Sequence, residues 1–465
     1  MLPTGMLRRT SRLVALPMRH AARTAATASR LSRATAEEVA TRGVEQAFAT
    51  LGELRGGAVK LGQAFSLFEA AMPAEVAGPY RSAVNRLSEA TPGMPAAVVW
   101  RVVTGDLSLA YGSSWRDRLV DFDDAPAAAA SIGQVHRGRW RDDSGDLVDV
   151  AVKVQYPGVA KALRSDVRTA RILGRLVGRL TGLDLGWFTD ELAARMLDEV
   201  DYPREARVQR QVAAAFARRM PGPSRRCPAA GVREPPGRTS VVVPHVYAAT
   251  PRVLVSRWLD GVPLTALLDG GTDQLPVGWR SLDRAEAADL AGRLIGHAGY
   301  APASCTGWMH ADPHPGNFLL LPGGRLGLVD FGSVAAMPDG IPEPLGRLAA
   351  AVLAADAAAT RWWARRAGLL APAAGVELID FLRPVVAAAG EETFTYSPEW
   401  WRALVTHLAA PRFGAVRRQL HPPREYALIW RGVLSIASLY AGLGATVPTR
   451  GFELAYSPGF RHGAG

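Results

Sequence analysis

The segment HADPHPGN at residues 310–317 is followed, thirteen residues after Asn317, by Asp330-Phe331-Gly332. One aspartate five residues ahead of an asparagine on a single loop, with a second aspartate beyond a short hairpin, is the arrangement that phosphoryl transfer needs. It supplies Asp312 as a base or orienting group, and Asn317 and Asp330 as two oxygen ligands for Mg²⁺. Because magnesium keeps several waters, one carboxylate and one amide oxygen from the protein are enough. Either motif alone is a weak signal, but together at this spacing they predict a phosphoryl-transfer site.

Lysine is rare in this chain, which makes each lysine informative. Of the 54 basic residues only three are lysines, namely Lys60, Lys153 and Lys161. Where arginine is the default, a retained lysine indicates a site that needs a compact ammonium group. Lys153 ends the motif Val150-Ala151-Val152-Lys153 on a predicted strand, the place of the lysine that holds the α- and β-phosphates in kinases. The sequence offers three candidates for its carboxylate partner on the next helical segment. They are Glu199, Asp201 and Glu205.

A run of alanines precedes the first strand, where ordinary kinases carry a glycine-rich loop. Glycine lets backbone N–H groups approach phosphates closely because it has no Cβ. Here alanine methyl groups replace the glycine hydrogens. We therefore expect the backbone amides to approach the phosphates less closely or at a different angle. The residues predicted to face the nucleotide are Ala128, Ala129, Ala130 and Ser131.

The pattern along the chain predicts a strand-rich part followed by a helix-rich part. A polar turn at 142–145 joins strands Gln134–Trp140 and Leu147–Gln155 in a hairpin, and a second hairpin surrounds Gly323-Gly324. The fold class is therefore α+β, bilobal, with a cleft between the lobes. The other expected elements are helices over 36–72, 94–120, 159–200, 206–219 and 261–300, strands over 241–247 and 252–258, loops over 221–238 and 306–317, and helices in the remainder.

Composition excludes several classes of protein. With 465 residues, 48% hydrophobic and 21% charged, the chain can bury full cores, and two cysteines describe no disulfide framework. Nucleic-acid binding has only the basic net charge in its favour, since no recognition motif appears. The segment 432–447 has no charge but is too short to span a bilayer, so a buried helix is favoured.

Seven arginines and no acidic residue lie within residues 1–36. Such a segment is typical of a mitochondrial transit peptide, and equally of a basic arm that contacts anionic lipid. We favour the second interpretation, which predicts a cytoplasmic bacterial protein with peripheral contact at the inner face of the membrane. A homodimer is left open.

The motifs as a set resemble the UbiB/AarF family of atypical protein-kinase-like proteins, which includes the mitochondrial coenzyme Q kinase-like proteins. The resemblance covers about residues 50–335 in order. The segments that carry it are Lys60-Leu61-Gly62-Gln63 (the family's KxGQ motif), the alanine-rich run 126–135, VAVKVQYPGV at 150–159, Glu199-Val200-Asp201-Tyr202, Arg204-Glu205-Ala206, HADPHPGN and Asp330-Phe331-Gly332.

The resemblance implies roles for individual residues. Lys153 would pair with Glu205 at the nucleotide phosphates, Asp312 would be the aspartate at the base position, and Asn317 with Asp330 would hold magnesium. An N-terminal helical extension would cover the cleft and bring Lys60 and Gln63 to the nucleotide site. Lys60 would contact the carboxylates of Glu199 and Asp201. The implied divisions are a basic, disordered arm at 1–35, the helical extension at 36–120, an N-lobe at 121–260 and a helical C-lobe at 261–465.

The resemblance also implies a function. An extension lying where a kinase binds its peptide argues against phosphorylation of proteins in trans. ATP and Mg²⁺ are the expected cofactors, and the expected activity is that of an ATPase or phosphotransferase supporting quinone or isoprenoid lipid metabolism. A lipid or quinone precursor is the expected partner. Two alternatives stay open, namely a catalytically weak nucleotide-binding scaffold or lipid-binding regulator, and a small-molecule kinase of the aminoglycoside or choline type.

Overall fold

The computed structural model describes residues 93–130, 132–161, 163, 198, 200–217, 240–271, 274–371, 377–420 and 422–463. The predicted arm, the KxGQ helix, most of the predicted helix 159–200 and the loop 221–238 lie outside these residues. The described residues form two compact units. The first holds those up to Arg204 together with Tyr247–Ser256, and the second holds those of Glu205–Val246 and Arg257 onward.

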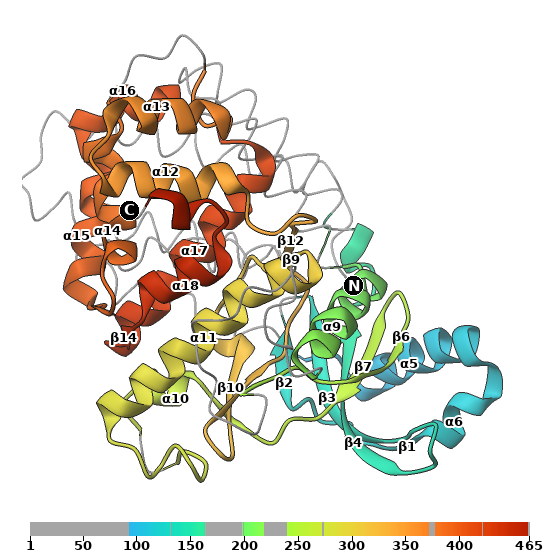
Figure 1. Ribbon diagram of the computed structural model, residues 1–465. Helices are drawn as coiled ribbons and strands as arrows, with labels where there is room; N and C mark the ends of the chain where they lie inside the picture. Colours follow the sequence, from blue (N-terminus) through green and yellow to red (C-terminus); the bar gives the residue numbers. More distant parts are fainter. Residues whose placement is uncertain are drawn as a thin grey trace, which may run out of the picture. The chain divides into compact units, whose positions relative to one another are not determined.

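The first unit combines one sheet with helices (Figure 1). Helix α5 (Ala96–Tyr111), the short turn η1 (Gly112–Ser114) and α6 (Trp115–Arg118) confirm the predicted helical region 94–120. The main sheet has the order β1-β3-β4-β7-β6, and β2 pairs with β3 outside that path. Its strands are β1 (Leu119–Phe122), β2 (Ala128–Ala130), β3 (Gly133–Arg141), β4 (Leu147–Gln155), β6 (Val246–Ala249) and β7 (Val253–Arg257).

The predicted hairpin of this sheet is confirmed as β3 and β4, paired from Gly133↔Gln155 to Arg141↔Leu147. Its turn follows from the sequence, because the Asp142 carboxylate accepts from the backbone N–H groups of Ser144 at 2.9 Å and Asp146 at 3.0 Å. An aspartate side chain that bonds the backbone two residues ahead stabilises such a reversal.

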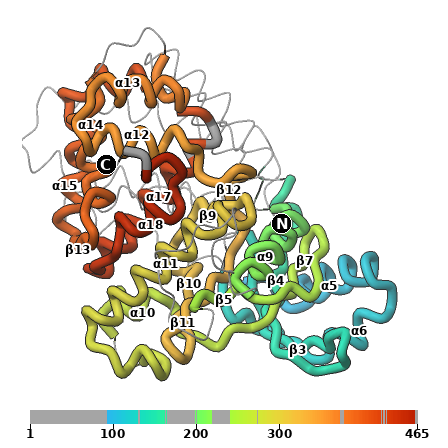
Figure 2. Tube along the Cα trace, in the orientation of Figure 1, coloured from blue at the N-terminus to red at the C-terminus, as the bar shows by residue number. Residues whose placement is uncertain are grey.

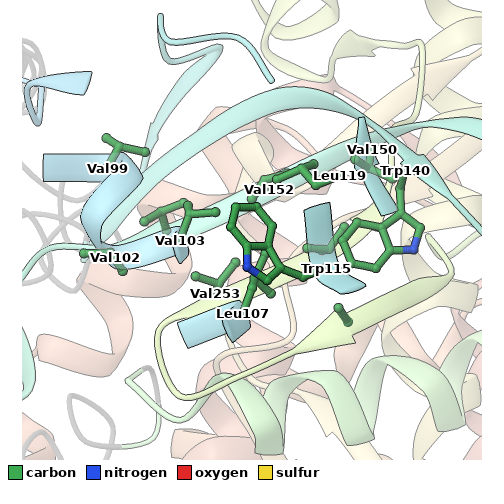
Figure 3. Packing of buried hydrophobic residues seen from close by; sticks show 13 residues of the cluster. Val99, Val102, Val103, Leu107, Trp115, Leu119, Trp140, Val150, Val152 and Val253 are labelled. Carbon is green, nitrogen blue, oxygen red and sulfur yellow. The ribbon is translucent and has the colours of Figure 1, made fainter. Parts of the chain in front are cut away.

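One face of this hairpin belongs to the core of the first unit. Val150, Val152 and Val154 are completely buried, as the alternation of side chains along a strand predicts. They pack with α5 and with the indoles of Trp115 and Trp140 (Figure 3). Lys153 belongs to the other set of alternate residues, so its side chain leaves β4 on the face opposite this core.

The structure corrects the predicted strand at 241–247. The chain forms two strands there, β5 (Val241–Val242) and β6, which belong to different sheets. Pro244 lies between them, and a proline has no N–H group with which to continue a ladder. Strand β5 pairs with β11 (Arg325–Leu328) in the order β5-β11-β10-β8, which also includes β10 (Phe318–Leu321) and β8 (Val262–Pro263).

The predicted helix at 261–300 is also wrong in its first half. That region contains β8, a single turn α10 (Thr265–Leu268) and a loop, and α11 (Arg284–Thr306) begins only at its cap. Gly270 and Gly278 adopt positive φ angles of 83° and 98°, which a helix interior does not contain. Asp283 and Glu286 form a reciprocal capping box with bonds of 2.8 and 3.0 Å, and this box sets the start of α11.

The second unit is rich in helices, as predicted. Helix α11 runs beside α17 and α18 (Figure 2). The remaining helices and strands of this unit are α9 (Tyr202–Ala217, with Tyr202–Arg204 in the other unit), β9 (Trp308–His310), η2 (Pro315–Asn317), β12 (Val334–Ala336), α12 (Glu343–Leu353), α13 (Ala357–Arg366), α14 (Ile379–Gly390), β13 (Phe394–Thr395), α15 (Pro398–Ala409), η3 (Pro411–Phe413), α16 (Gly414–Gln419), α17 (Arg424–Leu443), β14 (Thr446–Val447), α18 (Thr449–Tyr456) and η4 (Phe460–Gly463).

Two expectations about single segments have a structural outcome. The uncharged segment from Gly432 is helical as far as Leu443, and its Ile436 and Tyr440 are buried, which confirms the expected buried helix. Within the described residues, no helix combines the length and the apolar character needed to cross a membrane.

Cys305 is disulfide-bonded, which corrects the expectation of no disulfide. The other cysteine of the chain, Cys227, lies outside the described residues.

Candidate active site

The catalytic loop, defined here as residues 310–317, connects β9 to β10 in the second unit. Its backbone is wound around Asp312, whose carbonyl oxygen accepts from the N–H of His314 at 2.8 Å and from Nδ2 of Asn317 at 3.1 Å. The His314 ring accepts in turn from the N–H of Gly316 at 3.2 Å. Two prolines, at 313 and 315, restrict φ in the same segment. The loop is thus held by its own hydrogen bonds.

Strand register brings Asp330 to this loop. In the β10–β11 hairpin Phe318 faces Leu328, and the N–H of Val329 donates to the carbonyl of Asn317 at 3.1 Å. In the second pair, β9 with β12, His310 faces Val334. Asp330 lies on the short stretch between β11 and β12, so the two pairings hold it beside both ends of the loop. The structure therefore brings together the three residues predicted from the motif spacing, Asp312, Asn317 and Asp330.

A buried histidine joins the two motifs. His310 is 5% exposed, and its Nε2 lies 2.7 Å from the carbonyl oxygen of Asp330. Its Nδ1 lies 3.2 Å from the backbone N–H of Asp312, which can only donate. Nδ1 is therefore the acceptor and Nε2 carries the proton, a tautomer assigned from the bonds. Burial lowers the pKa of His310, which favours this neutral form.

The oxygen donors of the site fit a magnesium ion. Because Asn317 uses Nδ2 to hold the loop, its Oδ1 is the amide atom left to act as a ligand. The Asp330 carboxylate is oriented by the N–H of Gly332, which donates to Oδ1 at 2.8 Å. One amide oxygen and one carboxylate are the hard donors that Mg²⁺ prefers. Asn317 and Asp330 would hold the ion, which would neutralise charge on phosphate oxygens when bound.

In the first unit, Lys153 lies in the same sheet as the alanine run, with one strand between them. Ala128 pairs with Val135, and Val135 pairs with Lys153, so the three residues form one row across β2, β3 and β4. The Lys153 ammonium lies 5.3 Å from the centroid of the Tyr202 ring, within the range of a cation–π contact. The predicted alanine loop is corrected here, since Ala128–Ala130 is strand β2. Ala128 and Ala129 are exposed.

The remaining predicted site residues have varied outcomes. Glu205 is buried in the first turn of α9, at 2% exposure. Asp201 accepts from the N–H of Arg204 at 2.9 Å and so caps that helix, and Pro203 lies in its first turn. Lys153 and Glu205 belong to different units, and their pairing stays a prediction. Lys60, Gln63, Ser131 and Glu199 lie outside the described residues.

Sequence reasoning missed one residue of this site. Arg431 on α17 donates from a guanidinium NH₂ to Oδ1 of Asp312 at 2.8 Å, across 119 residues of sequence. Nothing local distinguishes it, because it is one of 51 arginines in a chain with 54 basic residues. Its position becomes visible only once α17 is placed against the catalytic loop.

The model for the ABC1 atypical kinase-like domain matches residues 86–361, a range that contains the segment with Lys153, the HADPHPGN loop and Asp330-Phe331-Gly332 but begins after Lys60 and Gln63. The chain belongs to the ABC1 atypical kinase-like family. The resemblance inferred from the motifs is thereby confirmed, as is a fold of mixed helix and sheet with a kinase-like domain. The ABC1 match ends within α13, before the helix that carries Arg431.

Named relatives of this ABC1 protein come from plants, animals and bacteria. ACTIVITY OF BC1 COMPLEX KINASE 8, chloroplastic, of Arabidopsis thaliana is 29% identical over 297 residues, which is 62% of this chain and 33% of the plant protein. Atypical kinase COQ8B, mitochondrial, of Rattus norvegicus is 34% identical over 166 residues, 35% of this chain and 29% of the rat protein. The alignments thus span about a third of these relatives' length.

A solved structure matches nearly the whole chain. It is the complex of Rv3197 with erythromycin from Mycobacterium tuberculosis, with a TM-score of 0.62 and 35% sequence identity. The match covers 92% of this chain and 98% of that protein. The similarity therefore extends beyond the ABC1 match into the C-terminal part of the chain.

Proposed function

We propose that this protein uses Mg-ATP as an ATPase or phosphotransferase. The observation that carries the proposal is the convergence of Asp312, Asn317 and Asp330 through two strand pairings. Two of these residues supply oxygen donors for a metal and the third a carboxylate beside it. In phosphoryl transfer there is little for the protein to do besides positioning and electrostatic stabilisation, and this set of groups suits both. Lys153 would hold the nucleotide phosphates from the first unit.

The proposed acceptor belongs to quinone or isoprenoid lipid metabolism. The similarity to two COQ8 atypical kinases supports this part of the proposal. Both belong to the group of coenzyme Q kinase-like proteins that the motifs resemble. Protein substrates are disfavoured because the resemblance implies a helical extension in the place of a peptide. The seven arginines of residues 1–36 would suit contact with an anionic membrane surface.

A second candidate is a binding protein with little or no turnover. Within the second unit a cavity of about 1050 Å³ is lined in part by Trp308, Ala336, Glu343 and Tyr456. Its size suits a large ligand. Trp308 and Ala336 pair with each other at the far ends of β9 and β12 from His310 and Val334. That a neighbouring structure was solved in complex with erythromycin supports a bulky ligand for this protein too.

ATP hydrolysis by the full-length protein tests both candidates. We expect ADP release that requires Mg²⁺ and rises on adding vesicles containing anionic lipid together with a phenol resembling a quinone precursor. Vesicles of neutral lipid are the matched control for the surface charge. Nucleotide binding without turnover under every condition would reject the enzyme. Binding of erythromycin by such an inactive protein would then favour the second candidate.

Replacing Ala129 by glycine tests the position of the alanine run. We expect a change in the ATP dissociation constant, because removing the methyl group lets the backbone approach phosphate more closely. Fluorescence titration with a labelled ATP analogue measures it. Ala127→Gly, one residue before β2, is the control for added backbone freedom. Superimposable binding curves for Ala129→Gly and the wild type would contradict contact between β2 and the phosphates.

A further inference from the structure

Arg431 forms an ion pair with the aspartate at the base position. The guanidinium NH₂ and Oδ1 of Asp312 are 2.8 Å apart, and the two side chains are 23% and 15% exposed. A guanidinium–carboxylate bond in such a shielded place is little weakened by salt or water, unlike a surface pair. Both residues belong to the second unit, so one compact body contains the whole contact.

Helix α17 lies directly against the catalytic loop at this point. A Cβ atom on Gly432, the residue after Arg431, would come within 2.9 Å of the His310 carbonyl oxygen and 3.3 Å of the Met309 methyl group. Only a residue without a side chain lets the helix approach so closely. The glycine and the arginine thus act together, one allowing the approach and the other using it to reach Asp312.

Different parts of the protein hold the backbone and the side chain of Asp312. Its backbone is held within the loop by His310, His314 and Asn317. The four residues 313–316 include no lysine or arginine. A guanidinium group reaches the carboxylate from another segment, since Arg431 on α17 donates to Oδ1 of Asp312.

We propose that Arg431 is a positioning residue that sets the orientation of the Asp312 carboxylate for the phosphoryl acceptor. The proposal rests on the proposed function, because it assigns to Arg431 a role in that reaction. Arg431 acts through Asp312 and needs no contact with the nucleotide. A displaced carboxylate should slow the reaction of bound ATP while leaving ATP affinity unchanged, since misplacement of about 1 Å at a reacting group can cost ~10²-fold in rate.

Steady-state hydrolysis by Arg431→Ala, Arg431→Gln and Arg431→Lys tests this role. We expect kcat to fall by ~10²-fold in the alanine and glutamine variants, with the KM for ATP unchanged. The lysine variant should recover part of the loss because it keeps the positive charge. Arg361→Ala, which removes another ion pair of the same unit, with Glu377 at 2.6 Å, is the matched control and should keep wild-type kcat.

A double-mutant cycle separates positioning from a merely structural role. In the Asp312→Asn background, Arg431→Gln should cause almost no further loss of kcat, since the group it positions is already gone. Wild-type kcat in Arg431→Gln, a change confined to KM, or an equal loss in both backgrounds would overturn the proposal. If Arg431→Ala fails to fold, the glutamine and lysine variants decide alone. A wild-type protein that binds but never hydrolyses ATP would instead overturn the proposed function, and this inference with it.

Discussion

Asp330→Asn should lower the rate of Mg-ATP turnover by ~10²–10³-fold, a loss comparable to removing one preorganised electrostatic group from an enzyme site. The substitution replaces a carboxylate ligand of the proposed metal by a neutral amide of nearly the same shape. The amide oxygen can still accept from the N–H of Gly332, whose bond to Oδ1 is 2.8 Å long in the wild type. The loop should therefore keep its conformation while losing its charge.

The measurement is ADP release at saturating Mg²⁺, with thermal unfolding of each variant as a check on folding. Asp269→Asn, an exposed aspartate in the same unit, is the control for the loss of one negative charge. We expect it to retain wild-type turnover. A normal rate in Asp330→Asn would contradict the magnesium assignment, whereas a lower melting temperature with a normal rate would show that Asp330 serves the fold alone.

The core of the candidate site could be predicted from the sequence because its residues lie close together in it. Asp312 and Asn317 share one loop, and a hairpin with Gly323 and Gly324 returns the chain to Asp330. Both glycines adopt positive φ, at 81° and 68°, as a tight reversal requires. Local patterning thus determined the register, and the register determined which side chains meet.

Arg431 could not be predicted because its role depends on how a distant helix packs. Its partner lies 119 residues earlier in the chain. Helical periodicity relates only residues three or four positions apart, so it cannot indicate such a distant contact. The sequence around 431 indicates a buried helix but not the loop against which that helix lies. Gly432 offered a clue, since a glycine in a helix interior lowers helix propensity and often has a packing reason.

The alanine run was predicted as a loop because it stands in the place of the glycine-rich loop of ordinary kinases. Alanine also has low strand propensity. It forms β2 because β3 offers partners, with Ala128 facing Val135 and Ala130 facing Gly133. Gly133 is itself required, since a Cβ there would lie 2.2 Å from the carbonyl oxygen of Val154. Pairing between strands overrode the preference of single residues, which is information that a local pattern does not contain.

Asp106→Ala should cost about 1–3 kcal/mol of the free energy of unfolding, the cost of leaving a buried hydrogen-bond donor without its acceptor. The arginine of the pair, Arg252, is 46% exposed, so the substitution leaves no buried charge behind. Asp106 is 7% exposed on α5 and lies beside the turn between β6 and β7. It accepts from the hydroxyl of Thr250 at 2.9 Å, from the N–H of Arg252 at 2.8 Å and from the guanidinium of the same arginine. Alanine leaves those donors without this acceptor.

Urea unfolding of the wild type and of Asp106→Ala measures the loss of stability. We expect the variant to unfold at a lower urea concentration, with the same dependence of the free energy of unfolding on urea. Asp149→Ala is the matched control in the same unit, because its pair with Arg137 has a similar length of 2.8 Å but both side chains are exposed, at 44% and 42%. An exposed pair contributes only about 0–1 kcal/mol. Equal losses in the two variants would mean that burial adds nothing at Asp106. A large difference would show that this aspartate ties α5 to strand β7, the neighbour of the strand that carries Lys153.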